Sequence, residues 1–193
     1  GETTQGGYSK HIVVREEFVL NVPEGMDLAK TAPILCAGIT TFSPLRTWGV
    51  KEGTRVGVIG LGGLGHMAVK LAAAMGAEVT AISRSNKKEA EAKAMGAKGI
   101  LVSTDEDAMQ AAGSSFDLII DTAPVKHDVG QYAPLLDIDG TIVIVGQVGP
   151  MEELMTPPLV MGRRRVAGSL IGGIQETQEV LEFCAEHGIY PDC

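Results

Sequence analysis

Apolar residues after Thr54 come in short runs that alternate with stretches of helical periodicity. This alternation is typical of βαβ units, in which parallel strands are connected by helices. Six runs are predicted to be strands, at 55–59, 78–82, 99–102, 116–121, 140–145 and 166–171. Between the first two, apolar residues from Leu64 to Met75 recur at helical spacing, and Gly76 is placed to end that helix. The pattern predicts an α/β Rossmann fold, a doubly wound parallel sheet of about six strands with helices on both faces.

The remaining segments extend this picture. Helical patterns cover residues 28–36, with Asp27 as the N-cap, and also 39–48, 87–95 and about 176–187. Residues 8–20 are rich in Ile, Val and Phe and precede a turn at 23–25, so we expect a strand that belongs to a neighbouring domain. The chain starts without Met and stops just after the last helical pattern, so we expect a piece of a longer protein.

Charge and composition disfavour several classes of function. With 16 Lys and Arg against 24 Asp and Glu, the net charge is −8, so we expect neither nucleic acid nor an anionic membrane as a partner. The three cysteines, Cys36, Cys184 and Cys193, indicate neither a disulfide framework nor a paired-cysteine zinc site, because they are odd in number and far apart. A reducing, cytoplasmic compartment fits them best. The sequence has no long apolar run and no basic leader, so we expect neither a transmembrane span nor a signal peptide.

A glycine-rich loop carries the strongest functional signal. Gly60, Gly62 and Gly65 have the G-x-G-x-x-G spacing between the first predicted strand and its helix. The first glycine would make a tight turn, the second would let a pyrophosphate approach the backbone, and the third would let helix and strand pack closely. A flexible glycine turn is the alternative, but strand, loop, helix and second strand occur at the right lengths. The predicted cofactor-binding loop comprises Gly60, Leu61, Gly62, Gly63, Leu64 and Gly65.

The end of the second predicted strand distinguishes between the two nicotinamide dinucleotides. An Asp or Glu there would accept hydrogen bonds from the adenine ribose of NAD. The chain instead has Ser83, Arg84 and Ser85, followed by Lys88. Hydroxyls and cations suit a 2′-phosphate, with Arg84 as a planar fork on the adenine side and Lys88 as a point charge. We therefore predict NADP(H) as the cofactor; the alternative is a solvated basic turn that opens a helix.

Several motifs together resemble one enzyme family. The chain is similar to the zinc-dependent medium-chain alcohol dehydrogenases, and most of all to the cinnamyl alcohol dehydrogenase branch, over essentially its whole length. The motifs that carry the resemblance are residues 33–41, the glycine loop with His66 after it, the Ser83-Arg84-Ser85 strand end, Gly6-Gly7-Tyr8-Ser9, Asp121-Thr122, residues 158–163 and residues 168–172.

The resemblance implies a two-domain enzyme in which a catalytic zinc polarises the oxygen of an alcohol or aldehyde and a hydride moves to or from the nicotinamide. Residues 1–26 would end the first catalytic segment, 27–188 would form the NADP-binding Rossmann domain, and 189–193 would begin the return to the catalytic domain. Thr40 would lie near the nicotinamide and Thr122 near its ribose. The resemblance also places these residues along the nicotinamide ring: Val145, Gly146, Ser169, Leu170 and Ile171.

Cys36 matches the third protein ligand of the family's catalytic zinc. The family's other ligands, a Cys and a His-Glu pair, have no match in this chain, and neither has its four-cysteine structural zinc lobe. Catalytic zinc needs about three protein ligands and one open position. We therefore expect zinc in the full-length enzyme and not in this chain alone. Taken without its motif, Cys36 would be interpreted as a small buried hydrophobe.

Structural roles suffice for the other histidines and for the arginine run. We expect His66 to be a partly buried helix residue, and His11, His127 and His187 to lie at the surface because none has Cys, Asp or Glu at ligand spacing. Residues 163–165 are expected to form a solvated loop before the sixth strand.

The sequence thus favours the NADP(H)-binding part of a zinc-dependent oxidoreductase that interconverts a primary alcohol and an aldehyde. Two alternatives stay open: a zinc-free reductase of the same superfamily, and a non-catalytic nucleotide-binding or redox-sensing module. We also expect a homodimer through the edge at 166–171, because an apolar sheet edge must be paired or covered and the resembled family pairs this one.

Overall fold

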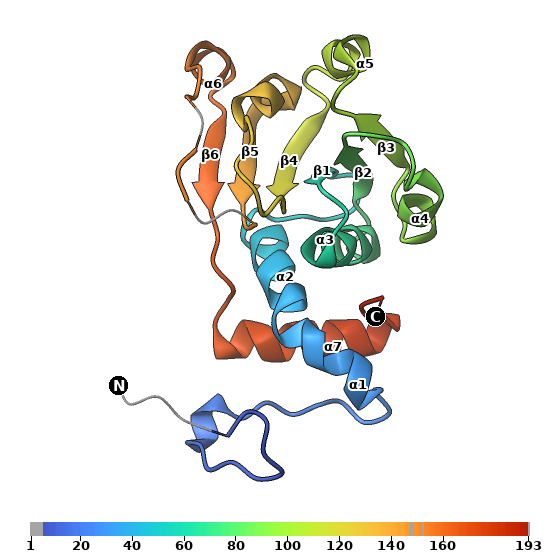
Figure 1. The fold of residues 1–193 in the computed structure, drawn as a ribbon, viewed down its shortest axis with the longest axis vertical. Coiled ribbons are helices and arrows are strands. Elements are labelled where there is room, and N and C mark those ends of the chain that lie inside the picture. Colours follow the sequence, from blue (N-terminus) through green and yellow to red (C-terminus); the bar gives the residue numbers. More distant parts are fainter. Residues whose placement is uncertain (1–5, 147–148, 152, 193) are drawn as a thin grey trace.

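A six-stranded parallel sheet forms the centre of the molecule, as the computed structural model in Figure 1 shows. The structure describes residues 6–146, 149–151 and 153–192. The strand order is β3-β2-β1-β4-β5-β6, so the chain reverses its direction of winding between β1 and β4. This confirms the predicted doubly wound Rossmann sheet. The strands are β1 (Arg55–Ile59), β2 (Glu78–Ser83), β3 (Gly99–Val102), β4 (Phe116–Asp121), β5 (Leu136–Ile144) and β6 (Arg165–Gly168).

Helices cover both faces of the sheet. One apolar cluster joins the sheet to α2, α3, α4 and α7, and a second joins it to α5, α6 and η3. The helices are η1 (Glu16–Phe18), α1 (Leu28–Thr31), η2 (Ala32–Leu35), α2 (Ala37–Thr47), α3 (Gly63–Ala74), α4 (Glu89–Ala94), α5 (Glu106–Ala111), η3 (Gly130–Leu135), α6 (Pro157–Gly162) and α7 (Ile174–His187). In the described part of the chain, none has the length and apolar character needed to cross a bilayer.

The side chains of β4 show why the sheet needs both layers. Leu118 and Ile120 pack into the cluster that contains α2 and α3, whereas Ile119 between them packs into the cluster that contains η3. Successive side chains of a strand point to opposite faces, so a strand that is apolar at every position must be covered on both sides. All three residues are at most 2% exposed.

Two strand boundaries differ from the prediction by more than one residue, the start of β5 and the end of β6. β5 begins at Leu136 because its pairing with β4 continues through an irregularity between Phe116 and Leu118. The sequence pattern does not reveal this start, because polar residues at 137 and 139 interrupt the apolar run. β6 ends at Gly168. Gly168 is the last residue that pairs with β5, and Ile171, with a φ of +43°, lies in the loop that follows.

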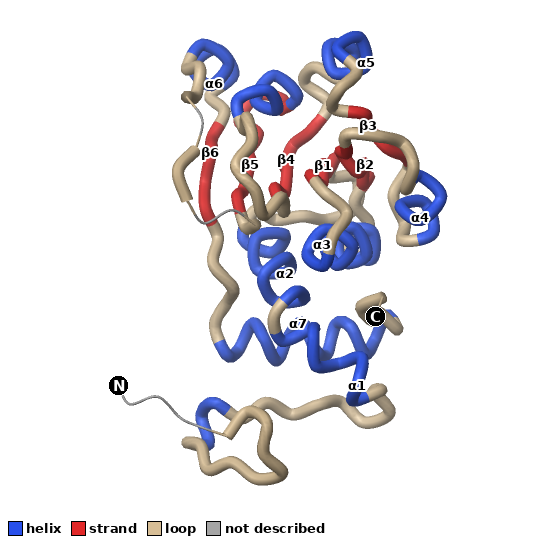
Figure 2. The backbone as a smooth tube through the Cα atoms, in the orientation of Figure 1, coloured by secondary structure: helices blue, strands red, loops and turns tan. Residues whose placement is uncertain are grey.

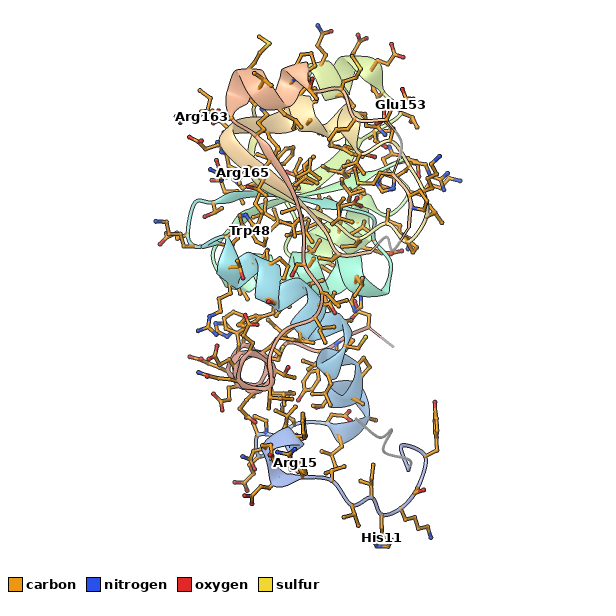
Figure 3. All side chains as sticks on the ribbon, turned by 90° about the vertical axis from the view of Figure 1, so that its left-hand side faces the viewer. His11, Arg15, Trp48, Glu153, Arg163 and Arg165 are labelled. Carbon is orange, nitrogen blue, oxygen red and sulfur yellow. The ribbon has the colours of Figure 1, made fainter. Side chains whose placement is uncertain are left out.

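The strand expected at residues 8–20 is absent. The segment holds only η1, its apolar side chains are largely exposed, and it lies beyond α7, far from the sheet (Figures 1 and 3). A strand needs a partner for its N–H and C=O groups, and no described segment pairs with this one. The expected helix at 28–36 also divides into α1 and η2, because Pro33 cannot donate the next helical hydrogen bond.

Cys184 is buried on α7, as its apolar position predicts, and Cys193 lies outside the described residues. Loops from the carboxyl ends of β1 and β4 come together beside α2 and α3 (Figure 2). These ends of the strands build the candidate site.

Candidate dinucleotide-binding site

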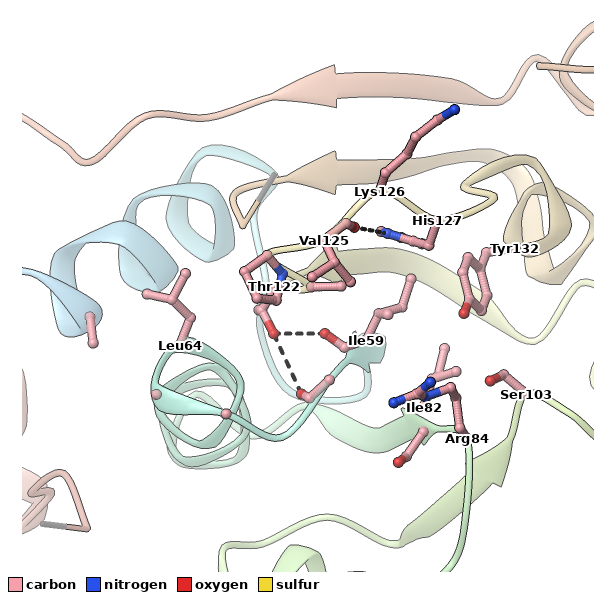
Figure 4. A pocket seen from close by; sticks show the side chains of 17 residues that line it. Ile59, Leu64, Ile82, Arg84, Ser103, Thr122, Val125, Lys126, His127 and Tyr132 are labelled. Atoms are coloured by element: carbon pink, nitrogen blue, oxygen red, sulfur yellow. Dashed lines mark hydrogen bonds between the residues drawn. The ribbon is translucent and has the colours of Figure 1, made fainter. Parts of the chain in front are cut away.

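The glycine loop leaves β1 through a turn whose shape depends on glycine. Gly60 has a φ of +86°, in the left-handed region that favours glycine. A Cβ at Gly65 would lie 2.0 Å from the carbonyl oxygen of Gly60, so α3 can approach the turn only without a side chain there. On the other side, the Thr122 hydroxyl donates a hydrogen bond to the carbonyl oxygen of Ile59 at 2.7 Å (Figure 4).

The start of α3 faces open space. Gly62 is the N-cap of this helix and offers no side chain to its first N–H groups. Such groups lack partners inside the helix and favour a negative charge nearby. A Cβ at Gly62 or Gly63 would meet no atom within 4 Å. The loop is therefore shaped to receive an anion at the helix N-terminus.

A cleft of about 690 Å³ lies at the carboxyl ends of the strands, where the strand order reverses. This is the position at which doubly wound sheets bind ligands, and the volume is in the range of ligand pockets. The cleft brings together the following predicted residues: Gly60, Gly62, Gly63, Leu64, Ser83, Arg84 and Thr122. The described residues along its wall include no carboxylate.

Arg84 follows β2 and, with Ser103 and Tyr132, lines one end of the cleft (Figure 4). Lys88 lines a neighbouring hollow that shares Gly62 and Gly63 with the cleft. Its ammonium donates a hydrogen bond to the Leu61 carbonyl oxygen at 3.2 Å. Arg84 therefore lines the cleft and Lys88 lines the hollow beside it, and the two spaces meet at Gly62 and Gly63.

Several predicted residues lie outside the cleft wall. Leu170 and Ile171 are 82% and 50% exposed, and Gly146 packs so closely on Thr122 that a Cβ would lie 2.4 Å from the Thr122 carbonyl. Their contacts with a nicotinamide stay predictions. The residues that do not line the cleft are Cys36, Thr40, Leu61, Gly65, Ser85, Lys88, Val145, Gly146, Ser169, Leu170 and Ile171.

Sequence reasoning missed part of the wall. Ser103, the loop 123–127 and Tyr132 line the cleft. Ser103 directly follows β3, as Arg84 follows β2, so the rule that ligands bind beyond the carboxyl ends of strands could have found it.

His127 corrects an expectation. It was predicted at the surface, but its side chain is only 17% exposed and its Nε2 lies 3.0 Å from Oδ2 of Asp121. The sequence feature that could have predicted this contact is Asp121, because an Asp at the end of an apolar strand needs a partner when it is buried. His66 is half-buried as expected, with Nδ1 3.1 Å from the Gly62 carbonyl oxygen. His11 and His187 are exposed, as predicted.

Comparison with known proteins identifies the family. Residues 63–186 match the family described as zinc-binding dehydrogenase. The chain belongs to the zinc-binding dehydrogenase family. The NADP-dependent alcohol dehydrogenase C of Mycobacterium bovis is 52% identical over 195 residues, which cover 100% of this chain and 56% of that protein. The chain therefore spans about half the length of such relatives.

Solved structures of related proteins share the fold of this zinc-binding dehydrogenase chain. A cinnamyl alcohol dehydrogenase from Sorghum bicolor superposes with a TM-score of 0.89 at 43% identity, over 94% of this chain and 52% of that one. A dehydrogenase of the cinnamyl alcohol type from Helicobacter pylori, complexed with NADP(H), gives a TM-score of 0.77 at 42% identity, over 90% and 49%. The resemblance inferred from the motifs is confirmed.

Cys36, the residue matched to a zinc ligand, lies between η2 and α2 and is exposed. The interpretation as a small buried hydrophobe is therefore wrong. Within the described ranges, no three His, Cys, Asp or Glu residues lie close enough together to hold a metal ion. The described residues of this zinc-binding dehydrogenase chain do not form a zinc site by themselves.

Proposed function

We propose that this chain is the NADP(H)-binding part of a zinc-dependent oxidoreductase that interconverts a primary alcohol and an aldehyde by hydride transfer. The observation that carries the proposal is the cleft at the reversal of the sheet, with a close-packed glycine loop on one side and Ser83 and Arg84 on another. The relatives support it, because an NADP-dependent alcohol dehydrogenase matches the whole chain.

The described residues that line the cleft offer a place for the phosphates and for both riboses of a dinucleotide. Gly62 and Gly63 leave space for a pyrophosphate at the N-terminus of α3. Ser83 and Arg84 would hold the phosphorylated adenine ribose, and Thr122, fixed by its hydrogen bond to Ile59, would hold the nicotinamide ribose. When bound, the nicotinamide supplies or accepts the hydride. The chain's own part is to bind and orient it.

Arg84 makes NADP(H) the preferred dinucleotide. A charge-assisted hydrogen bond to a phosphate stabilises a complex by roughly 1.5 to 3 kcal/mol, and about 1.4 kcal/mol corresponds to a tenfold change in affinity. No carboxylate on the described wall opposes the phosphate. NADPH should therefore bind at least about tenfold more tightly than NADH.

Calorimetric titration of NADPH and NADH into the protein that contains this chain tests the proposal. Ser83→Asp and Arg84→Ala should each reduce the preference for NADPH. Arg163→Ala, at an exposed arginine outside the cleft, is the matched control and should leave it unchanged. Equal affinities for the two cofactors, or a preference that survives Arg84→Ala, would show that the phosphate is held elsewhere.

The proposed full-length enzyme would bind a catalytic zinc with Cys36 as one of its ligands. Cys36 is exposed and accessible to ligands from a further segment. In the full-length protein, Cys36→Ala should remove zinc and alcohol oxidation together while leaving NADPH binding intact, because Cys36 lies outside the cleft wall. An unmodified protein that is active without zinc would instead be a zinc-free reductase.

We also propose that residues 1–26 end the first catalytic segment, that 27–188 form the NADP-binding domain and that 189–193 begin the return to the catalytic domain. A cytoplasmic location is proposed as well, and the free thiols of Cys36 and Cys184 support it.

A homodimer through β6 completes the proposal. β6 is the edge strand of the sheet, and Leu170 just beyond it is 82% exposed. Unpaired strand edges next to apolar side chains invite pairing. Leu170→Lys should convert a dimer to a monomer in analytical ultracentrifugation, whereas Leu28→Lys, at another exposed leucine, should not. A monomeric unmodified protein at high micromolar concentration would contradict this.

A further inference from the structure

The carboxyl end of β4 holds a buried carboxylate next to the cleft. Asp121 is 0% exposed, and its Oδ1 accepts a hydrogen bond from the backbone N–H of Ala123 at 3.1 Å. Among the described residues, neither Oδ2 nor His127 Nε2 has a hydrogen-bond partner, and the two buried atoms lie 3.0 Å apart. A buried carboxylate oxygen without a proton to share is strongly unfavourable. The two side chains therefore depend on each other.

The second nitrogen of His127 determines how many protons the pair holds. Nδ1 lies 2.8 Å from the carbonyl oxygen of Val125, and a carbonyl only accepts, so Nδ1 carries a hydrogen. Two arrangements are then possible. Nε2 presents its lone pair to a protonated Asp121, or Nε2 carries a hydrogen that faces an ionised Asp121. Each arrangement holds one proton between Nε2 and Oδ2. The 3.0 Å separation is short enough for a proton to lie between the two atoms, although the pair does not meet the geometry of a regular hydrogen bond.

This pair anchors the wall of the cleft. Residues 123–127 line it, and Figure 4 shows His127 of this loop between Val125 and Tyr132. The imidazole contacts Val125 of the same loop through Nδ1 and Asp121 at the end of β4 through Nε2. The ring also packs edge-on against Tyr132, another wall residue, with ring centroids 6.2 Å apart.

The other titratable and charged groups around the pair come from three elements. Tyr132 on η3 packs against the imidazole, and burial raises the pKa of its phenol, so it stays neutral at working pH. Arg84 after β2 and Asp128 beside His127 both act electrostatically on Tyr132. Lys126 precedes His127 on the same loop. Burial raises the pKa of Asp121, which agrees with a proton held at the pair.

We propose that Asp121 and His127 share one proton and thereby hold the loop 123–127 as a wall of the dinucleotide cleft, so that loss of this proton at alkaline pH weakens cofactor binding. The inference rests on the proposed dinucleotide binding. His127 is a positioning residue, because it acts through the loop. Once the proton is lost, the imidazole keeps a single N–H, so a lone pair faces either the Asp121 carboxylate or the Val125 carbonyl, and one of the two contacts is lost.

Titration of NADPH into the natural protein between about pH 6.5 and about pH 9 tests the inference. In Asp121→Asn, the amide N–H donates to the Nε2 lone pair, so the contact needs no titratable proton. Relative to this variant, the Kd of the unmodified protein should rise about fivefold or more over that range, as for the loss of one buried hydrogen bond. The Kd of the unmodified protein is divided by the Kd of Asp121→Asn at each pH. This ratio cancels the effect of the titration of the cofactor's own phosphate, which is the same for both proteins. Asp107→Asn, the same change at an exposed position on α5, should follow the unmodified profile.

A measurement without cofactor separates this inference from the proposed function. In the ¹⁵N NMR spectrum of histidine-labelled protein, assigned with His127→Gln, Nδ1 should carry a hydrogen at about pH 6.5, and the ring-nitrogen signals should change as the shared proton leaves at higher pH. This readout stands even if Asp121→Asn does not fold. Absence of NADPH binding at every pH would overturn the proposed function. Binding with parallel pH profiles in both proteins, or an Nδ1 without hydrogen at about pH 6.5, would overturn this inference alone.

Discussion

Gly65→Ala tests whether the turn and the helix pack as closely as described. The added Cβ would lie 2.0 Å from the carbonyl oxygen of Gly60, 2.8 Å from its carbonyl carbon and 3.0 Å from Oγ1 of Thr122. Two of these atoms belong to the backbone, so no side-chain rotation relieves the contact. The helix must retreat by about 1 Å, since 3.0 − 2.0 = 1.0 Å separates the observed distance from the shortest ordinary one.

That displacement sets the expected magnitudes. Overpacking of a tight interior typically destabilises by about 1 to 3 kcal/mol, and the gain of about 1 kcal/mol from replacing glycine by alanine in a helix offsets part of it. We expect the free energy of unfolding in urea to fall by up to about 2 kcal/mol. Because a misplacement of about 1 Å can reduce function about a hundredfold, NADPH should bind at least about tenfold more weakly.

Gly63→Ala is the matched control for stability. It introduces the same group in the first turn of the same helix, where no atom lies within 4 Å of the new Cβ. Its free energy of unfolding should equal or exceed that of the unmodified protein. If Gly65→Ala proved as stable as Gly63→Ala and retained full affinity for NADPH, the close packing of α3 on the turn would be refuted.

Three further predictions follow from burial and ligand geometry. Burial raises the pKa of the Cys184 thiol to about 12, so iodoacetamide should alkylate exposed Cys36 long before Cys184 in the folded protein; equal rates by peptide mass spectrometry would contradict this. Burial also raises the pKa of Asp121, so its contribution to stability is present below the unfolded-state value and is lost as pH rises through the folded-state value. Asp121→Asn should therefore make the free energy of unfolding, compared at about pH 3 and about pH 9, less dependent on pH. The 193-residue chain alone should hold no tight zinc, because Cys36 is its one matched ligand; about one zinc per chain by elemental analysis would refute this.

Local pattern predicted the parts of the structure that depend on neighbours along the chain. The spacing of Gly60, Gly62 and Gly65 predicted the turn between β1 and α3, and the apolar runs predicted six strands. These features follow from the backbone freedom of glycine and from the periodicities of helix and strand, which act over a few residues. For the same reason the helix that ends at Gly76 and the layers of the sheet were predictable.

Contacts between distant segments decided the rest. Residues 8–20 have a strand pattern, but a strand forms only beside a partner, and no described segment provides one. The wall of the cleft joins Arg84, Ser103 and Tyr132 from separate elements, which meet because parallel strands end at one edge of the sheet. The sequence shows Asp121 and His127 as two ordinary polar residues six positions apart. Only the tertiary structure removes water from both, and it is this desolvation that makes them depend on one shared proton.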